Sequence, residues 1–512
     1  MAMEKGQEIA ASDGEKGPEQ HAIDVGHVEH ADGRGEDTEQ KRVAVAEEVQ
    51  KKSRRVAALD AFRGLTIVLM ILVDDGGGAY ERIDHSPWNG CTLADFVMPF
   101  FLFIVGVAIA FALKRVPNIG AAVKKIVIRT LKMLFWGVLL QALIPLHVLV
   151  ERFDGMYKGG YSHAPDDLSY GVDMKKIRWC GILQRIALVY FVVALIEAFT
   201  TKVRPTTVRS GPYAIFDAYQ WQWLGGFIAF VIYIVTTFSL YVPYWSFVYH
   251  KDGDVNDGKQ FTVQCGVRAS LDQACNAAGY VDRQDCTFSS PNIGPLRADA
   301  PAWCLAPFEP EGLLSSISSI LSGTIGIHYG HVLIHFKVIS ENSLRPKCNV
   351  VKKISDLQSH KERLKHWLLL GFSLLVLGIL LHFTKAIPIN KQLYSFSYVC
   401  FTGGAAGIVL SAFYILIDVW GLRTPFLFLE WIGMNAMLVF VLGAQGILAA
   451  FVNGWYYESP DNSLVHWIVR HVFVNVWHSQ RLGTLLYVMF CEIVFWGVAA
   501  GVLHKLGIYW KL

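Results

Sequence analysis

Charged residues are scarce in this chain of 512 residues: Asp, Glu, Lys and Arg make up 17% of it, whereas hydrophobic residues make up 53%. So little charge excludes an ordinary soluble protein of this length. The sequence also lacks a G-x-x-x-x-G-K-[ST] phosphate loop, a dinucleotide fingerprint, an H-E-x-x-H zinc helix and a G-x-S-x-G elbow. It has no repeat of fixed period, and its basic loops are ordinary, so nothing supports nucleic-acid binding.

Long apolar runs are what the chain does contain. A run of roughly 18 or more apolar residues can cross about 30 Å of hydrocarbon as a helix. The pattern predicts an all-α fold, a polytopic transmembrane helix bundle of about ten spans with one cysteine-containing luminal loop. The expected spans lie near residues 57–74, 92–113, 126–149, 181–200, 222–247, 312–336, 366–384, 394–419, 427–452 and 484–506.

The basic groups close to the spans all fall on the same side of the membrane if there are ten spans. Short basic loops of this kind stay in the cytosol, so both ends of the chain are expected there. The connection that holds His85 then faces the opposite, luminal compartment. The basic groups are Lys51, Lys52, Arg54, Arg55, Lys114, Arg115, Lys124, Lys125, Lys202, Arg204, Arg209, those of residues 345–365, Lys505 and Lys511.

The N-terminal segment differs from the rest of the chain. Residues 1–53 are rich in Glu, Asp, Gly, Gln and Ala without apolar periodicity, so we expect a disordered cytosolic tail. It has no apolar h-region of a cleavable signal peptide, and the first span is expected to act as signal anchor. Residues 54–512 are expected to form the membrane domain, with a luminal loop at 250–309 and a cytosolic loop at 338–365.

Four of the nine cysteines lie together in the expected luminal loop, where disulfides can form. Two bridges are predicted there, but their pairing cannot be read from the sequence. A zinc site is the alternative, and the lack of a C-x-x-C pair counts against it. The four are Cys265, Cys275, Cys286 and Cys304; the others, Cys91, Cys180, Cys348, Cys400 and Cys491, are expected to be lone thiols.

Ionisable residues stand at both ends of the first expected span, although charge there is costly unless it faces a protein interior or water. Asp60 and Arg63 are three residues apart, so they share a helix face and are expected to pair. Arg63 either fixes the rotation of the helix in this way or contacts the phosphates of an anionic ligand entering from the cytosol. Asp74 and Asp75 end the span, before a glycine run at 76–78 that lets main chain approach a ligand closely.

His85 follows about ten residues later, in the short polar turn before the second span. Imidazole can take and return a proton near neutral pH. Asp84 and Asp95 are near enough in sequence to fix its tautomer. Either Asn89 or a backbone group of the glycine run could stabilise an oxyanion there. A single histidine is more often an ordinary surface or packed residue, so the residues alone leave a catalytic and a structural role open.

Two further polar groups fall inside expected spans. Gln184 and Arg185 open the fourth span and either line a pocket or form hydrogen bonds between helices. His328, His331 and His335 share one helical face. We expect them to form a polar lining rather than a metal site, because no carboxylate or cysteine partner is identifiable.

Six motifs follow one another in a fixed order along residues 54–512. They are LDAFRGLTIVLMILVDDGGG (59–78), HSPWNGCTLADFVMPFFLFIVG (85–106), IRWCGILQRIALVYFVVALIEA (177–198), CNAAGYVDR (275–283), FEPEGLLSSISSI (308–320) and INKQLYSFSYV (389–399). In this order they resemble the heparan-α-glucosaminide N-acetyltransferase family, itself similar to a broader set of transmembrane acyltransferases. The N-terminus resembles the shorter, plant- and bacterial-like architecture without the luminal N-terminal domain of animal members.

The resemblance implies an acetyl-CoA-dependent acyltransferase that moves acetyl from cytosolic acetyl-CoA to the amine of a terminal glucosamine-type sugar on the luminal side. It implies that His85, the histidine of the first luminal turn, is catalytic. The position eleven residues earlier is an asparagine in animal members and Asp74 in this chain. Since an ionised carboxylate cannot donate the hydrogen bond of an amide, Asp74 is expected to act as a base, an orienter of His85 or a protonated donor.

Two mechanisms remain open on this basis. His85 either deprotonates the attacking amine directly or forms an acetyl-imidazole in a double displacement. A polytopic transporter or proton-coupled carrier on a related scaffold, and an acyltransferase for another luminal acceptor, are the alternative functions. The expected site comprises His85, Asp74 and Asn89 as catalytic residues and Arg63, Gln184 and Arg185 as contacts of acetyl-CoA, with no metal.

The expected partners are the lipid bilayer, acetyl-CoA and an amino-sugar acceptor, with a homodimer left open and no nucleic acid. The resemblance implies an integral multi-pass protein of the lysosomal or vacuolar membrane. Other endomembranes and the plasma membrane are the alternatives.

Overall fold

The computed structural model describes most of the chain after the N-terminal segment. Contacts divide the chain at Arg55, and every described residue belongs to the second unit, Val56–Leu512. The expected tail at 1–53 lies outside the described residues, as do Cys286, Cys304 and Cys348. The described residues are 56–113, 118–143, 161–162, 171–172, 180–201, 214–248, 258–284, 311–343, 349–444, 448, 455–459 and 462–510.

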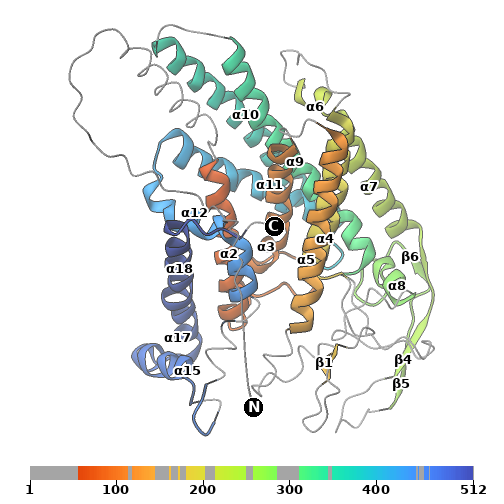
Figure 1. Cartoon of the computed structure of the whole chain (residues 1–512). Helices are drawn as coiled ribbons and strands as arrows, with labels where there is room; N and C mark the ends of the chain where they lie inside the picture. Colours follow the sequence, from red (N-terminus) through yellow and green to blue (C-terminus); the bar gives the residue numbers. More distant parts are fainter. Residues whose placement is uncertain are drawn as a thin grey trace, which may run out of the picture. The chain divides into compact units, whose positions relative to one another are not determined.

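The second unit is mainly helical, and its long helices pack beside one another (Figure 1). Short helical elements connect or extend them: α6 (Ala214–Ala218), α8 (Ala277–Gln284), α13 (Ala436–Val439), α15 (Leu464–Ile468) and α16 (Asn475–Trp477). The long helices are α2 (Ala57–Gly76), α3 (Val97–Leu113), α4 (Ile119–Leu143), α5 (Ile182–Thr200), α7 (Gln220–Ser239), α9 (Leu313–Ser343), α10 (Asn349–Phe383), α11 (Phe396–Phe413) and α18 (Ile493–Lys505), whereas α12 (Leu427–Met434) and α17 (Gln480–Tyr487) have only eight residues each.

Seven helices of the described part are long and apolar enough to cross a membrane. An eighth span results if the pair Thr424–Met434 and Ala436–Gly443, bent by 69°, is counted as one. The expectation of about ten spans is therefore not confirmed, although each expected span overlaps a helix. Two expected spans, which coincide with α2 and α4, are not among the seven helices or the bent pair. Each of these two helices carries four charged residues: Asp60, Arg63, Asp74 and Asp75 on α2, and Lys124, Lys125, Arg129 and Lys132 on α4.

Two expected boundaries also differ. The span expected at 222–247 ends at Ser239, since the chain turns extended at Leu240 and Pro243 cannot continue a helix. The cytosolic loop expected at 338–365 is largely helical, because α9 extends to Ser343 and α10 begins at Asn349. Charged residues at the end of α9 and at the start of α10 lower the local hydropathy but do not break these helices.

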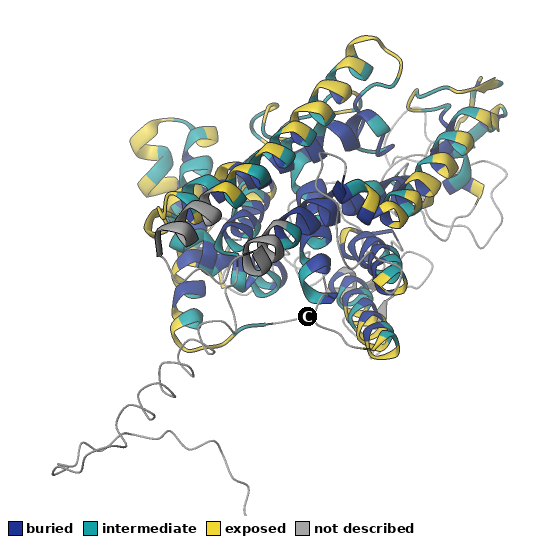
Figure 2. Cartoon of the chain, turned by 90° about the horizontal axis from the view of Figure 1, so that it is seen from above, coloured by how far each residue is buried: buried dark blue, intermediate teal, exposed yellow. Residues whose placement is uncertain are grey.

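Helix α9 lies in the middle of the bundle, whereas α10 lies at its edge. In the most apolar stretch of α9, 83% of the residues are buried, against 17% for α10. Figure 2 shows the same contrast, with buried positions in the interior and exposed ones along the outer helix faces. Small residues let α3 approach α9: a side chain at Gly326 would run into the backbone of Phe103, and one at Gly106 into that of Gly323.

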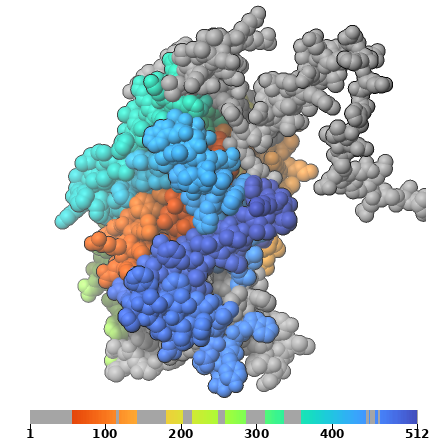
Figure 3. Space-filling model, turned by 90° about the vertical axis from the view of Figure 1, so that its left-hand side faces the viewer, coloured from red at the N-terminus to blue at the C-terminus, as the bar shows by residue number. Residues whose placement is uncertain are grey.

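The C-terminal helices close the bundle beside α2. Leu485 of α17 and Val488 pack next to Gly76 at the end of α2. In Figure 3 these C-terminal segments, in the darkest blue, cover much of the face that is turned to the viewer. The guanidinium of Arg481 also donates to the backbone carbonyl of Ala79. The connection after α2 is therefore held on one side by α17.

A small β-structure follows α7. Strand β3 (Tyr241–Val242) pairs antiparallel with β6 (Val267–Arg268), and β4 (Trp245–Val248) with β5 (Gln260–Val263). A separate pair joins β1 (Tyr161–Ser162) and β2 (Gly171–Val172). A disulfide links Cys265 to Cys275. One of the two expected bridges is thus present, and the other two cysteines of that loop lie outside the described residues.

The α3–α9 crossing yields a first prediction. Replacing Gly326 by valine forces the two helices apart, so we expect a loss of stability of at least about 1–3 kcal/mol. The thermal unfolding midpoint of the purified protein in detergent measures it. Gly120→Ala at the exposed start of α4, where the added carbon meets only ordinary contacts, is the matched control and should leave the midpoint unchanged. Equal midpoints for the two variants would contradict the close crossing.

Candidate active site

The connection between α2 and α3 is a compact turn rather than a loose loop. Helix α2 ends at Gly76, and backbone hydrogen bonds from Ile83 and Asp84 to the carbonyl of Tyr80 fold the chain back. The amides of Leu93 and Ala94 then donate to the carbonyls of Arg82 and Ile83. Both ends of the turn are therefore fixed against each other, and His85 lies between them.

Asp95 is the residue around which this turn is built. It lies in the short 3-10 helix η1 (Leu93–Phe96) that leads into α3, and it is fully buried. Its Oδ2 accepts hydrogen bonds from the backbone amide of Ser86 at 3.3 Å and from the amide and hydroxyl of Thr92, both at 3.0 Å. Its Oδ1 lies 3.0 Å from Nδ1 of His85. One buried carboxylate thus holds the turn and the imidazole together.

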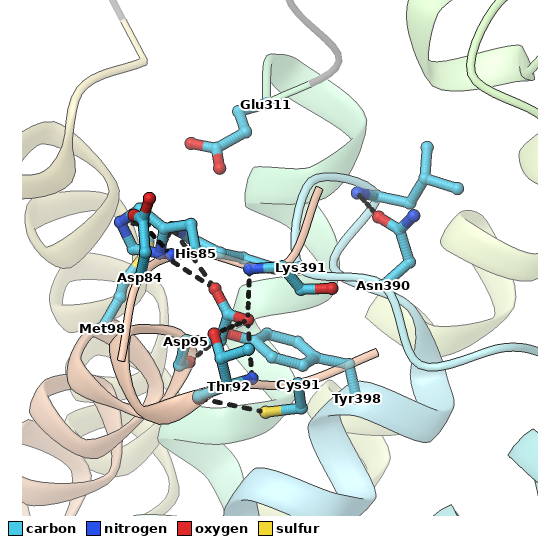
Figure 4. Close-up of polar contacts among 12 residues, drawn as sticks. Asp84, His85, Cys91, Thr92, Asp95, Met98, Glu311, Asn390, Lys391 and Tyr398 are labelled. Carbon is cyan, nitrogen blue, oxygen red and sulfur yellow. Dashed lines mark hydrogen bonds and ion pairs between the residues drawn. The ribbon is translucent and has the colours of Figure 1, made fainter. Parts of the chain in front are cut away.

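A lysine from the far part of the sequence completes the cluster. The turn between α10 and α11 lies against the His85 turn, with a β-bridge between Asn89 and Asn390 and a hydrogen bond from the amide of Gly90 to the carbonyl of Ile389 at 2.8 Å. It brings Nζ of Lys391 to 2.9 Å from Nδ1 and 3.2 Å from Nε2 of His85. Figure 4 shows Lys391, His85 and Asp95 facing one another.

This arrangement can perform acid–base chemistry. An imidazole whose Nδ1 proton is donated to a buried carboxylate keeps the lone pair of Nε2 for a substrate proton. About half of the His85 side chain is exposed (48%), so a ligand can reach it, whereas Asp95 is closed off from water. Asp84, the other acidic neighbour, accepts from the backbone amide of His85 and not from its ring.

The expected catalytic residues are only partly brought together. His85 and Asn89 share the turn, and Oδ1 of Asn89 accepts from Nδ2 of Asn390 at 3.4 Å. Asp74 is exposed at the end of α2 and makes no hydrogen bond to His85 in the described part of the chain, although it is within electrostatic range of Lys391. The carboxylate in contact with the imidazole is that of Asp95, and the catalytic role expected for Asp74 stays a prediction.

Of the three expected cofactor contacts, Arg63 lies on α2, whereas Gln184 and Arg185 are neighbours on α5. Arg63 contacts Asp60 at 3.0 Å, as predicted, and its guanidinium also donates to the carbonyl of Gly433 at 3.3 Å. Gln184 is buried and packs against Gly137 of α4. Whether any of them meets acetyl-CoA remains a prediction.

Arg185 is almost fully buried and joins three helices at the His85 end of the bundle. It donates to Sδ of Met98 on α3 at 3.6 Å, to the backbone carbonyl of Glu311 and, at 3.4 Å, to the Glu311 carboxylate, just before α9. In Figure 4 the Glu311 side chain extends toward the His85 cluster. The interhelical role that the sequence left open for Arg185 is therefore present.

Helix α9 begins at a well-defined point because Asp282 of α8 caps it. The carboxylate of Asp282 accepts hydrogen bonds from the amides of Gly312 and Leu313, each at 3.1 Å. The indole of Trp88, three residues after His85, donates to the carbonyl of Leu271 in the disulfide-closed loop at 3.1 Å. The loop with the Cys265–Cys275 bridge thus contacts the His85 turn, and α8, which follows it, caps the start of α9.

The histidines of α9 have a carboxylate partner that the sequence did not reveal. Nε2 of His331 lies 3.0 Å from Oε1 of Glu197 on α5, and the ring stacks on Tyr219 at 3.6 Å. His328 accepts from the indole of Trp223 at 3.2 Å. These contacts join α9 to α5 and α7 in the interior of the bundle. No group of three or more ligating side chains suited to a metal occurs among the described residues.

Cys91 stands next to the site but is poorly suited to be a nucleophile. Burial, together with the neighbouring Asp95 carboxylate, raises the pKa of the Cys91 thiol well above its ordinary value. A protonated thiol attacks thioesters slowly. The histidine is therefore the better candidate for the reacting group of this turn.

The fold and the site together define a class of protein: a multi-pass membrane protein with an oriented imidazole at one end of a helical bundle. Residues 55–153, which include the His85 turn, match the family model described as "Heparan-alpha-glucosaminide N-acetyltransferase, catalytic". The chain is also similar to curated relatives of that name, 29% identical over 460 residues in Mus musculus and 28% over 455 in Homo sapiens. These matches confirm the resemblance of the motifs to the heparan-α-glucosaminide N-acetyltransferase family.

The similarity covers most of this chain but less of the relatives. The matched regions are 88% and 87% of this chain, and 61% and 60% of the mouse and human proteins. The chain therefore spans about three fifths of the length of the curated relatives that it matches.

The raised pKa of Cys91 gives a second prediction. Because burial disfavours the thiolate, we expect iodoacetamide to modify Cys91 in the folded protein slowly at pH 8, and the rate to keep increasing as the pH rises beyond 9. Mass spectrometry of the peptide that carries Cys91 measures this rate. The same peptide in the unfolded chain is the control. Equal rates in the folded and unfolded states at pH 8 would show that the thiol is not shielded.

Proposed function

We propose that this protein is a membrane-bound acetyltransferase. It takes acetyl from acetyl-CoA supplied on the cytosolic side and transfers it to the amine of a terminal glucosamine-type sugar at the opposite, luminal end of the bundle, where His85 lies. The proposal is supported by the relatives' names, which are those of heparan-alpha-glucosaminide N-acetyltransferases. The location that we propose is a lysosomal or vacuolar membrane.

The single observation that carries the mechanism is the 3.0 Å contact between Nδ1 of His85 and the buried carboxylate of Asp95. We assign the Nδ1 proton to this contact, so that Nε2 accepts the proton of the attacking amine. The amine nitrogen forms a bond to the acetyl carbon, and the bond from that carbon to the sulfur of CoA breaks. The departing sulfur then takes the proton from His85, which leaves an amide and free CoA thiol.

The donor is proposed to reach the site along α2. Arg63 and Asp74 are eleven residues apart on this helix, or about 16 Å, a distance that the pantetheine arm of CoA can bridge. Arg63 is then placed to contact phosphate while the thioester lies near His85. Asp60 already pairs with Arg63, so binding of a phosphate there involves exchange of one anionic partner for another.

His85→Ala tests the proposed activity. We expect purified protein given acetyl-CoA and glucosamine to release CoA thiol, and the variant to lose at least about 10²-fold of this rate, because a general base contributes about 10²–10⁴-fold. A thiol reagent measures release, and mass spectrometry detects the acetylated sugar. His478→Ala, at an exposed histidine in the turn before α17, is the matched control. Solute movement without thiol release would instead indicate a transporter.

Asp95→Asn tests the orienting carboxylate. The amide oxygen can still accept from Ser86 and Thr92, whereas its NH₂ group faces Nδ1 of His85 and favours the wrong tautomer. We expect kcat to fall by about 10²-fold or more, with little change in the KM for acetyl-CoA and in the thermal midpoint. A variant with the wild-type kcat would exclude Asp95 from the mechanism.

Direct transfer and double displacement are separated by one further measurement. Direct attack of the amine leaves no labelled protein after incubation with radiolabelled acetyl-CoA alone. A label on the peptide that contains His85 would establish the acetyl-imidazole route.

A further inference from the structure

Lys391 is the residue of the site that the mechanism above does not use. Its side chain is only 19% exposed, and its ammonium group lies closer to the imidazole of His85 than to any carboxylate of the cluster. The distance from its Nζ to Oδ1 of Asp95 is 3.8 Å, longer than a hydrogen bond. Oδ2 of Asp95 is already occupied by three donors from Ser86 and Thr92. Lys391 and Asp95 therefore form an ion pair without a hydrogen bond, and the ammonium group makes its closest contact with the imidazole.

The two distances from Lys391 to His85 define the side from which it approaches. Nζ lies 2.9 Å from Nδ1 and 3.2 Å from Nε2. An approach to both nitrogens within the plane of the ring would drive Nζ into Cε1, the carbon between them. The ammonium group must therefore lie over the face of the ring. This position leaves the in-plane direction of Nδ1 to Asp95 and that of Nε2 to a substrate.

A cation in this place is suited to the charge that develops during acyl transfer. When an amine whose proton goes to Nε2 attacks a thioester, the acetyl carbon lies next to Nε2. The carbonyl electrons move onto oxygen, and donors or cations placed nearby stabilise that oxyanion. When the carbonyl reforms, the electrons return and the bond to sulfur breaks. We infer that Lys391 stabilises this oxyanion over the face of His85; the inference rests on the proposed acetyl transfer.

Asn89, the oxyanion donor expected from the sequence, is less well placed. It is exposed, its side-chain oxygen accepts from Asn390, and its backbone carbonyl accepts from the hydroxyl of Ser86 at 3.1 Å. No hydrogen bond joins Asn89 to the ring of His85 in the part of the chain that the structure describes. Lys391 contacts both ring nitrogens.

The backbone that carries Lys391 is fixed before any substrate binds. The amide of Tyr394 donates to the carbonyl of Lys391 and that of Ser395 to the carbonyl of Asn390, each at 3.0 Å. Asn390 is fully buried, and its Oδ1 accepts from the amide of Leu393 at 2.8 Å. A charge on a fixed backbone needs little reorganisation when the oxyanion forms. Preorganised groups of this kind contribute strongly to the rate because they are already in place at the transition state.

Lys391→Met tests the inference because it removes the charge and keeps most of the bulk. We expect kcat to fall by about 10²–10³-fold, with the KM for acetyl-CoA and the thermal midpoint close to wild type. Lys385→Met is the matched control, at an exposed lysine in the same turn before α11, and should keep the wild-type kcat.

A chemical rescue covers the case in which Lys391→Met folds poorly. Lys391→Cys is treated with 2-bromoethylamine, which attaches an aminoethyl group to sulfur and restores an ammonium at nearly the same length. We expect the treatment to raise kcat of this variant at least about tenfold, while treated wild type, which shares the other cysteines, shows no gain. A merely structural role of the lysine would not give this recovery.

The outcomes separate this inference from the proposed function. An active wild type together with a Lys391→Met variant whose kcat stays within about threefold overturns the role of Lys391 and leaves the acetyltransferase proposal standing. A variant with raised KM and unchanged kcat also overturns it, because the lysine then binds substrate and the transition state equally. No turnover by the wild type with any amine overturns both.

Discussion

The buried carboxylate of Asp95 is the constraint on which the site depends. Its Oδ2 closes the turn through Ser86 and Thr92, and its Oδ1 fixes the imidazole of His85. The hydroxyl of Tyr398 on α11 donates to the backbone carbonyl of Asp95. A buried carboxylate without these donors would be very costly, so the turn and the carboxylate stabilise each other. The position of His85 follows from this mutual requirement.

The fold supplies the second requirement, which is to bring distant segments to one end of the bundle. Close packing at Gly326 and Gly106 sets α9 against α3, and the cap from Asp282 fixes the residue at which α9 begins. Glu311, just before that start, meets Arg185 from α5. The packing in the middle of the bundle therefore determines the positions of Arg185 and Glu311 at its end.

The helices and the histidine turn could be predicted from the sequence because their signals are local. Apolar runs mark the helices, and Asp84, His85 and Asp95 are close together along the chain. The expected ten spans were not confirmed, because α2 carries four charged residues and the span expected at 126–149 extends beyond Leu143, the last described residue of α4. Lys391 was missed since 306 residues separate it from His85. The same reason applies to Glu197, which meets His331 from another helix.

The distribution of polarity along α2 constrains where chemistry can occur. Between Arg63 and Asp74 the helix carries one polar side chain, Thr66, and its hydroxyl donates to the carbonyl of Phe62 within the same helix. Such a stretch offers no group that could hold a charged intermediate in a low dielectric. Charge can be accommodated only at the two ends of α2. This distribution agrees with the proposed function, in which the phosphates of the donor bind at the Arg63 end and the oxyanion forms at the end where Lys391 and His85 meet.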